Sequence, residues 1–94
     1  MREIFRTPEF DEFIANLDEI AIAKIDYLKE ILISQPVINT KVAKKLVNTN
    51  FYEVRVSVNN EYRIVTFAID HDNINQCKTI LFIDGFLKKS TKRL

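Results

Sequence analysis

The sequence predicts a single α+β domain, with helices in its first third and strands in most of the remainder. Its 94 residues with 47% hydrophobic content fit one modest core. Apolar residues recur at helical spacing between residues 8 and 34 and alternate with polar ones from residue 51 to 67. One glycine and two prolines leave no composition for a linker. We therefore expect one domain over residues 1–94.

The first third reads as a short strand followed by two helices. Residues 2–6, REIFR, form the strand candidate, and Thr7 before Pro8 is typical of a helix that begins at the proline. Its apolar stripe consists of Phe10, Phe13, Ile14 and Leu17. A second helix runs from about Asp18 to Ser34. We expect the two helices to form an antiparallel hairpin whose acidic side chains face solvent.

Residues 51–67, FYEVRVSVNNEYRIVTF, predict a β-hairpin whose register decides where two arginines lie. A two-residue turn at Asn59-Asn60 would place Arg55 and Arg63 on opposite faces. A three-residue loop with a left-handed Asn60 would place them directly opposite each other on one face. The second register gives one apolar face that can cover the helices, so burial favours it.

Two arginines directly opposite each other repel, which indicates that an anion lies between them. Planar guanidinium groups bind phosphate through paired hydrogen bonds. The competing interpretation is a surface ladder of charges in which Glu53 and Glu61 neutralise Arg55 and Arg63.

The basic residues lie mainly in the second part of the chain. Residues 1–40 hold four Lys and Arg against eight Asp and Glu, and residues 41–94 hold ten against five. This asymmetry favours a polyanionic partner for one face. The segment VAKKLV, with Lys44 and Lys45, suits either an edge strand or a helical turn.

A strand candidate, KTILFID, precedes the basic segment GFLKKSTKRL. In that segment Gly85 permits a bend and Phe86 offers a stacking surface beside Lys88, Lys89, Lys92 and Arg93. Aromatic and basic residues in this combination are typical of single-stranded nucleic-acid binding, although a frayed basic tail is the alternative.

Other sequence features indicate no further site. The longest apolar runs are far shorter than the ~20 residues that span a bilayer, and acids lie among the first residues in place of a signal peptide. We therefore expect a cytoplasmic protein. Cys77 stands at the start of an apolar run and is expected to be a strand residue without a redox role. No cluster has metal-ligand spacing and no phosphate-binding glycine loop exists, so no metal or other cofactor is expected.

The order of these segments resembles the RelE/ParE toxin superfamily, and most closely its HigB-like branch. The matching segments are TPEF, KKL, the YEVR and YR parts of the hairpin, and GFLKK after the last strand. The resemblance implies an α+β fold in which two helices pack on a curved antiparallel sheet. It also implies a bacterial toxin that cleaves messenger RNA on the ribosome and is neutralised by a co-encoded antitoxin, a helix-turn-helix protein.

Carried over residue by residue, the resemblance implies that Arg55 and Arg63 lie on the concave sheet and contact the scissile phosphate, and that Lys89, the third catalytic residue, holds a neighbouring phosphate as Lys88 and Lys92 do. It implies RNA contacts for Lys44, Lys45, Phe86, Lys88, Lys92 and Arg93. Two features depart from the family, because relatives often carry histidine where this chain has Asp84, and many continue past the lysines with a proline and a helical segment.

The residue inventory suits RNA cleavage without a metal, because RNA supplies its own nucleophile. The 2′-oxygen attacks the adjacent phosphorus and leaves a 2′,3′-cyclic phosphate, so the protein must align the groups and stabilise negative charge. Glu53 and Asp84 are candidates for the general base, whereas His71 lies in a turn by composition. Two alternatives stay open, a ParE-like topoisomerase inhibitor that cleaves nothing and an inactive nucleic-acid-binding relative.

Overall fold

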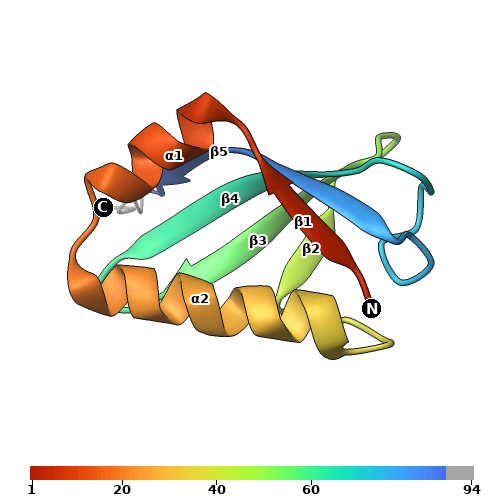
Figure 1. Ribbon diagram of the computed structural model, residues 1–94, viewed down its shortest axis with the longest axis horizontal. Helices are drawn as coiled ribbons and strands as arrows, with labels where there is room; N and C mark the ends of the chain where they lie inside the picture. The colour runs from red at the N-terminus through yellow and green to blue at the C-terminus, as the bar shows by residue number, and fades with distance from the viewer. Residues whose placement is uncertain (89–94) are drawn as a thin grey trace, which may run out of the picture.

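The computed structural model describes residues 1–88, which form two helices and one five-stranded sheet (Figure 1). Along the chain the elements are β1 (Glu3–Arg6), α1 (Pro8–Ala15), α2 (Glu19–Ser34), β2 (Ala43–Lys45), β3 (Phe51–Ser57), β4 (Glu61–Ala68) and β5 (Thr79–Leu87). The strands lie in the order β1-β5-β4-β3-β2. The α+β class and the short N-terminal strand are confirmed. The sheet is mixed, because β1 pairs parallel with β5 while the other pairs are antiparallel.

Side-chain caps fix where both helices begin. The Thr7 hydroxyl accepts a hydrogen bond from the backbone N–H of Phe10 at 3.1 Å, and Pro8 occupies the first turn. In α2 the Asp18 carboxylate accepts from the N–H of Ala21 at 2.8 Å. Asp18 is thus the cap of the second helix, which starts one residue later than the sequence predicts.

The two helices do not form the expected antiparallel hairpin. In Figure 1 they diverge from their connection, with α1 lying along β5 and α2 lying against β3 and β1. The reason is that each apolar stripe packs on the sheet instead of on the other helix. Phe10 of α1, for example, packs on Phe82 of β5 with ring centroids 5.0 Å apart.

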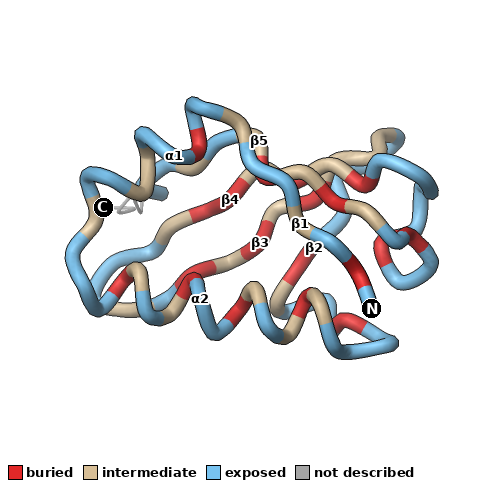
Figure 2. Tube along the Cα trace, in the orientation of Figure 1, coloured by how far each residue is buried: buried red, intermediate tan, exposed pale blue. Residues whose placement is uncertain are grey.

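The core lies between the helices and one face of the sheet. Val54, Val56 and Ile64 are completely buried there against the α2 residues Ile25 and Leu28, and Figure 2 shows buried positions alternating with more accessible ones along the strands. This alternation means that the other sheet face, which we call the open face, carries the side chains at odd-numbered positions of β3 and β4.

The hairpin has the predicted three-residue loop, but the backbone conformation of the loop differs from the prediction. Ser57 pairs with Glu61, so Val58, Asn59 and Asn60 connect β3 to β4. The prediction of a left-handed Asn60 is wrong, because Asn60 does not have a positive φ; the loop closes through a bond from the Val58 N–H to the Asn60 carbonyl. Among described non-glycine residues the positive φ belongs to Asn48, at 61°, in the turn between β2 and β3.

The remaining segments settle three further expectations. VAKKLV contains an edge strand, β2, and no helical turn. Cys77 is not a strand residue, because it lies in the loop before β5, where its thiol donates to the Ile74 carbonyl. Gly85 forms no bend and lies inside β5. Within residues 1–88 no helix combines the length and the apolar character that crossing a membrane requires.

Candidate functional site

The hairpin register brings the two arginines together on the open face. Arg55 of β3 pairs directly with Arg63 of β4, one residue pair away from Val54 and Ile64 on the core face. This confirms the register chosen from the sequence, in which burial of the apolar side chains forces the two guanidinium groups onto the same face.

Arg63 is buried and Arg55 is half-buried, and both guanidinium groups are incompletely paired. The Arg63 side chain is 8% exposed, and its Nη1 donates to the Glu61 carboxylate at 3.3 Å and to the Tyr62 carbonyl at 3.1 Å. The Nε atoms of Arg55 and Arg63 are both buried without a hydrogen-bond partner among the described residues. Buried polar groups are nearly always paired, so two neighbouring unpaired donors indicate a place for an anion.

Glu61 neutralises one of these charges, as the charge-ladder interpretation expects. Hydrogen bonds from Ser57 and Arg63 lower the pKa of the Glu61 carboxyl below its ordinary value, so it is ionised at neutral pH. Glu53 does not complete the ladder, because it pairs across the strands with Val65 and Lys44. Among residues 1–88, Arg55 has no carboxylate within salt-bridge distance. The pair therefore keeps an excess positive charge.

The arginines also line a cavity of about 410 Å³ at the edge of the sheet. It is bounded by residues of α2, of the segment before β2, and of the hairpin: Lys24, Leu28, Lys41, Val42, Arg55, Ser57, Glu61 and Arg63. Lys24 is not among the predicted site residues, since it lies in the acidic first part of the chain and only its helical spacing from Leu28 links it to the core edge.

Two predicted RNA-binding residues share the open face with the arginines. Phe86 pairs with Arg63, so Phe86, Arg63 and Arg55 form one row across β5, β4 and β3. Phe86 is 44% exposed and presents its ring to solvent. Lys44 belongs to the next row, opposite Glu53. The predicted aromatic surface and one predicted lysine are thus brought to the arginine pair.

Other predicted residues lie elsewhere. Lys45 pairs with Tyr52 and lines a different cavity, together with His71, on the helix side of the sheet. Lys88 follows β5, is exposed, and donates its backbone N–H to the Glu61 carbonyl at 2.7 Å. Lys89, Lys92 and Arg93 lie outside the described residues.

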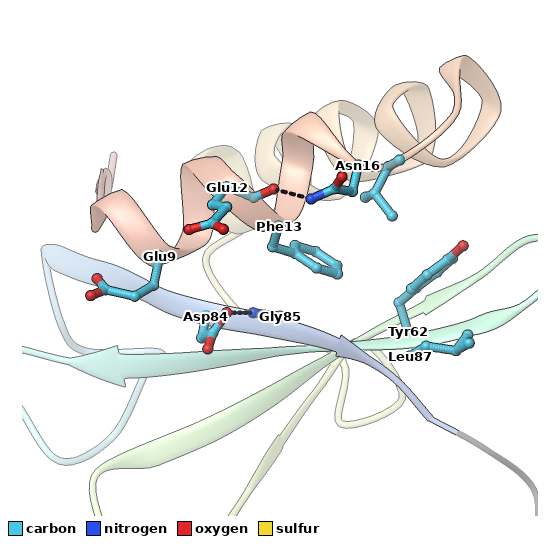
Figure 3. A pocket seen from close by; sticks show the side chains of 9 residues that line it. Glu9, Glu12, Phe13, Asn16, Tyr62, Asp84, Gly85 and Leu87 are labelled. Atoms are coloured by element: carbon cyan, nitrogen blue, oxygen red, sulfur yellow. Dashed lines mark hydrogen bonds between the residues drawn. The ribbon is translucent and has the colours of Figure 1, made fainter.

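Neither of the two sequence candidates for a general base, Glu53 and Asp84, lies in the arginine row, because both pair with Val65 in the next row. Asp84 lines a cavity of about 540 Å³ beside α1, with Glu9, Glu12 and Tyr62, and accepts the N–H of Gly85 (Figure 3). Glu53 is one row away from the arginines. Glu61 is the carboxylate that touches Arg63.

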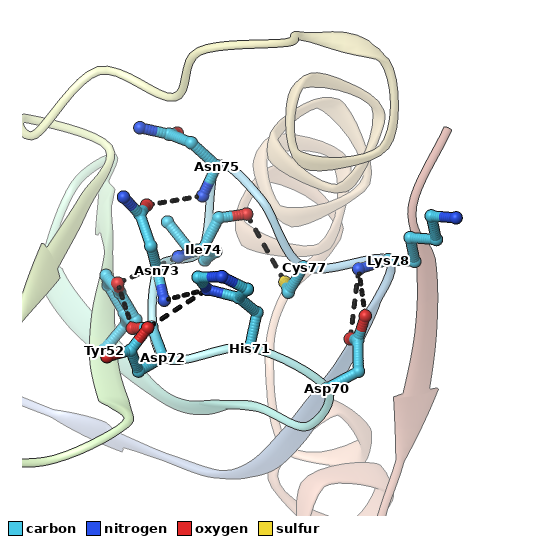
Figure 4. Close-up of polar contacts among 9 residues, drawn as sticks. All are labelled: Tyr52, Asp70, His71, Asp72, Asn73, Ile74, Asn75, Cys77 and Lys78. Atoms are coloured by element: carbon cyan, nitrogen blue, oxygen red, sulfur yellow. Dashed lines mark hydrogen bonds and ion pairs between the residues drawn. The ribbon is translucent and has the colours of Figure 1, made fainter.

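His71 takes part in the structure of a loop. Its Nδ1 accepts from the N–H of Asn73 at 3.0 Å, beside the Tyr52 hydroxyl that bonds the Asp72 carbonyl and the Ile74 N–H (Figure 4). This loop lies on the helix side of the sheet. The contacts of His71 are therefore those of a residue that stabilises the loop.

The fold is similar to that of a protein whose structure was solved as part of a complex. The chain matches one chain of a RelB-RelE antitoxin-toxin complex from Methanococcus jannaschii with a TM-score of 0.62 and 20% identity, covering 88% of both chains. No protein-family model matches the sequence, and no curated protein sequence matches it. What the chain shares with that complex is its fold, which has two helices on one side of a five-stranded sheet.

Proposed function

We propose that this chain is the toxin of a bacterial toxin-antitoxin system and cleaves messenger RNA on the ribosome without a metal ion. The observation that carries the proposal is the pair of opposed arginines whose Nε atoms are buried and lack partners among the described residues. The structural neighbour supports it, since that fold occurs in an antitoxin-toxin complex. An activity on translating ribosomes also places the protein in the cytoplasm.

In this proposal the protein stabilises charge and the RNA supplies the nucleophile. The 2′-oxygen loses its proton and attacks phosphorus, the bond to the 5′-oxygen breaks, and that oxygen takes up a proton, which leaves a 2′,3′-cyclic phosphate. Arg55 and Arg63 donate to the phosphate oxygens as negative charge grows, and Lys89 adds a third cation. Phe86, in the same row, stacks on a neighbouring base.

The test is to replace each arginine and measure cleavage separately from binding. Arg55→Ala and Arg63→Ala should each lower cleavage by about 10²- to 10³-fold, as the loss of one transition-state donor does, while ribosome binding falls much less. Primer extension on an induced, translated message, beside the same message without its start codon, measures cleavage. Arg6→Ala is the control, because Arg6 is exposed and pairs at the surface with Asp11.

Three results would contradict the proposal. Cleavage that does not depend on translation would exclude the ribosome, and growth arrest with intact messages and broken DNA would indicate the topoisomerase inhibitor. A wild-type protein without effect on growth would indicate the inactive nucleic-acid-binding relative.

We further propose that the cognate antitoxin, a helix-turn-helix protein, covers the open face. An apolar row crosses β1, β5, β4 and β3 there through register partners, and it continues to Leu46, just after β2, through the bond from the Leu46 N–H to the Phe51 carbonyl. The row consists of Leu46, Phe51, Phe67, Leu81 and Phe5, and Phe5 is 52% exposed. A partner with an apolar stripe and carboxylates beside it would match this row and the neighbouring arginines.

Co-purification with the product of the adjacent reading frame tests the antitoxin surface. Phe5→Asp together with Phe67→Asp should weaken the complex at least 100-fold, because two charges would be buried against an apolar stripe. Tyr27→Asp is the control, since Tyr27 is 60% exposed on α2. Unchanged affinity in the double variant would rule out this surface, and a loss caused instead by reversing Lys88, Lys89 and Lys92 together would move the contact to the basic tail.

A further inference from the structure

The edge cavity gathers more positive charge than its carboxylate can neutralise. Lys24 from α2 and Lys41 from the segment before β2 line it together with Arg55 and Arg63. Its single carboxylate, Glu61, is engaged by Arg63 and Ser57. Four cations around one space repel one another, so the arrangement is unfavourable unless anions occupy it.

Neither of the two lysines forms an ion pair within the described residues. Neither Lys24 nor Lys41 has a carboxylate within 4.0 Å among residues 1–88. Lys24 is half-buried, with its Nζ 5.5 Å from the centre of the Tyr27 ring, which restricts where the ammonium group lies. By contrast Lys29, also on α2, pairs with Asp26.

The strand layout leaves a passage from the arginines to these lysines. β2 pairs with residues 52–54 of β3, and the last bond on this edge runs from the Arg55 N–H to the Val42 carbonyl. Beyond Arg55 the edge of β3 is therefore open, and the space beside it is the cavity that α2 borders. The row of Phe86, Arg63 and Arg55 ends at this opening.

We propose that Lys24 and Lys41 bind the backbone phosphate next to the one held by Arg55 and Arg63, so that a single RNA strand crosses the sheet at right angles to its strands. The strand passes over Phe86 and the arginine pair and leaves across the open edge of β3 toward α2. This inference rests on the proposed function and names the substrate as single-stranded RNA that contributes at least two consecutive phosphates. The lysines are binding residues, because they touch the neighbouring phosphate and not the reacting one.

The experiment compares Lys24→Ala/Lys41→Ala with the control Lys29→Ala/Lys78→Ala, which removes equal charge away from the cavity. The probes are fluorescent 2′-O-methyl RNA oligonucleotides with one, two or four phosphodiesters, which bind but cannot be cleaved. Anisotropy titrations from low to high salt give the slope of log Kd against log[salt]. Each lost phosphate contact on a single strand should reduce that slope by about 0.7.

We expect the wild type and the control to gain affinity from the second phosphodiester and the cavity variant to lose that gain, with a slope reduced by about 0.7 for the one lost phosphate. On a translated message the cavity variant should cleave with a raised KM and an unchanged kcat, since the contact is equal in ground and transition states.

The results separate this inference from the proposed function. If the wild type cleaves messages but the cavity variant matches the control in slope and KM, the inference is wrong and the function stands. If the wild type binds RNA through Lys24 and Lys41 but cleaves nothing, the proposed cleavage of messenger RNA is wrong and the proposed RNA contact of the two lysines stands. A wild type without salt-dependent RNA binding would overturn the inference.

Discussion

Individual arginines in this protein differ in how their guanidinium groups are satisfied. Arg2 is 7% exposed and donates five hydrogen bonds to backbone carbonyls, at 2.6 to 3.0 Å. The acceptors lie at the end of α2 and in the loop before β5: Leu32, Gln35, Pro36, Ile74 and Asn75. Arg55 and Arg63 keep unpaired Nε atoms within the described structure. Complete pairing indicates a structural arginine, and incomplete pairing indicates a ligand site.

Arg2 should therefore matter for stability and not for catalysis. Arg2→Met should lower the free energy of unfolding by about 3 kcal/mol or more, because it leaves several partly buried carbonyls without a donor. Arg2→Lys should recover only part, since an ammonium group cannot reach acceptors arranged around a planar fork. Urea denaturation measures both, with the exposed Arg6→Met as control. Equal stability of the Arg2 and Arg6 variants would contradict this role.

What the sequence could predict about these residues depends on how far their partners lie along the chain. The Arg55–Arg63 pair was predictable, because alternation within one hairpin fixes which side chains share a face. Burial of Arg2 was not, because its acceptors are carbonyls 30 to 73 residues away that carry no side-chain signature. Lys24 was missed for the same reason, since only the packing of α2 on the sheet brings it to the arginines.

At the scale of elements, α1 approaches β5 closely at the chain's single glycine. A Cβ on Gly85 would overlap the ring of Phe13, so the glycine is needed for close packing and not for a turn. Gly85→Ala should cost about 1 to 3 kcal/mol of stability by overpacking, although the ring can shift toward the adjacent cavity. Adding Phe13→Leu should restore part of the loss in thermal denaturation. If Gly85→Ala and Phe13→Leu lower the stability additively, the contact between position 85 and the Phe13 ring is not the cause of the loss.

The connection between β4 and β5 depends on a carboxylate. Asp70 accepts from the N–H group of Lys78 (Figure 4) and from that of Thr79, at 2.8 to 3.0 Å, and these bonds lower its pKa below the ordinary value of 3.8. A depressed pKa adds stability above the unfolded value and loses it as the pH falls through the folded value. Asp70→Asn should thus be less stable than wild type at pH 7, with the difference shrinking below about pH 3.8. The urea concentration at the unfolding midpoint, determined for both proteins over a range of pH, measures this difference in stability. A difference that does not change with pH would contradict the role of the Asp70 carboxylate.

Elements were predictable wherever local chemistry specifies them. Thr7 and Pro8 signalled the start of α1, the apolar spacing signalled α2, and the alternating pattern signalled β3 and β4. The prediction of an antiparallel helical hairpin was wrong. An amphipathic pattern indicates which face of a helix is buried, but it does not indicate which element covers that face. Likewise the parallel pairing of β1 with β5 and the bulge beside Val65 arise from tertiary contacts.

At the scale of the whole molecule, the sheet joins the two ends of the described chain. β1 at residues 3–6 pairs with β5 at residues 79–87, and Arg2 bonds the loop just before β5. The arginine row also needs β5, because Phe86 is its third member. The candidate site is thus complete only when contacts across nearly the whole sequence have formed.

During synthesis this topology sets a time order. A ribosome releases β1, both helices and the β3–β4 hairpin first, but β1 has no strand to pair with until β5 emerges. Contacts of such long sequence separation form late, so the nascent chain should stay unclosed, and its arginine row incomplete, until the last strand is released. Nascent chains stalled with β5 still inside the tunnel should be digested rapidly by protease, and chains with β5 released should resist. Resistance before β5 emerges would show that the hairpin and helices close without it.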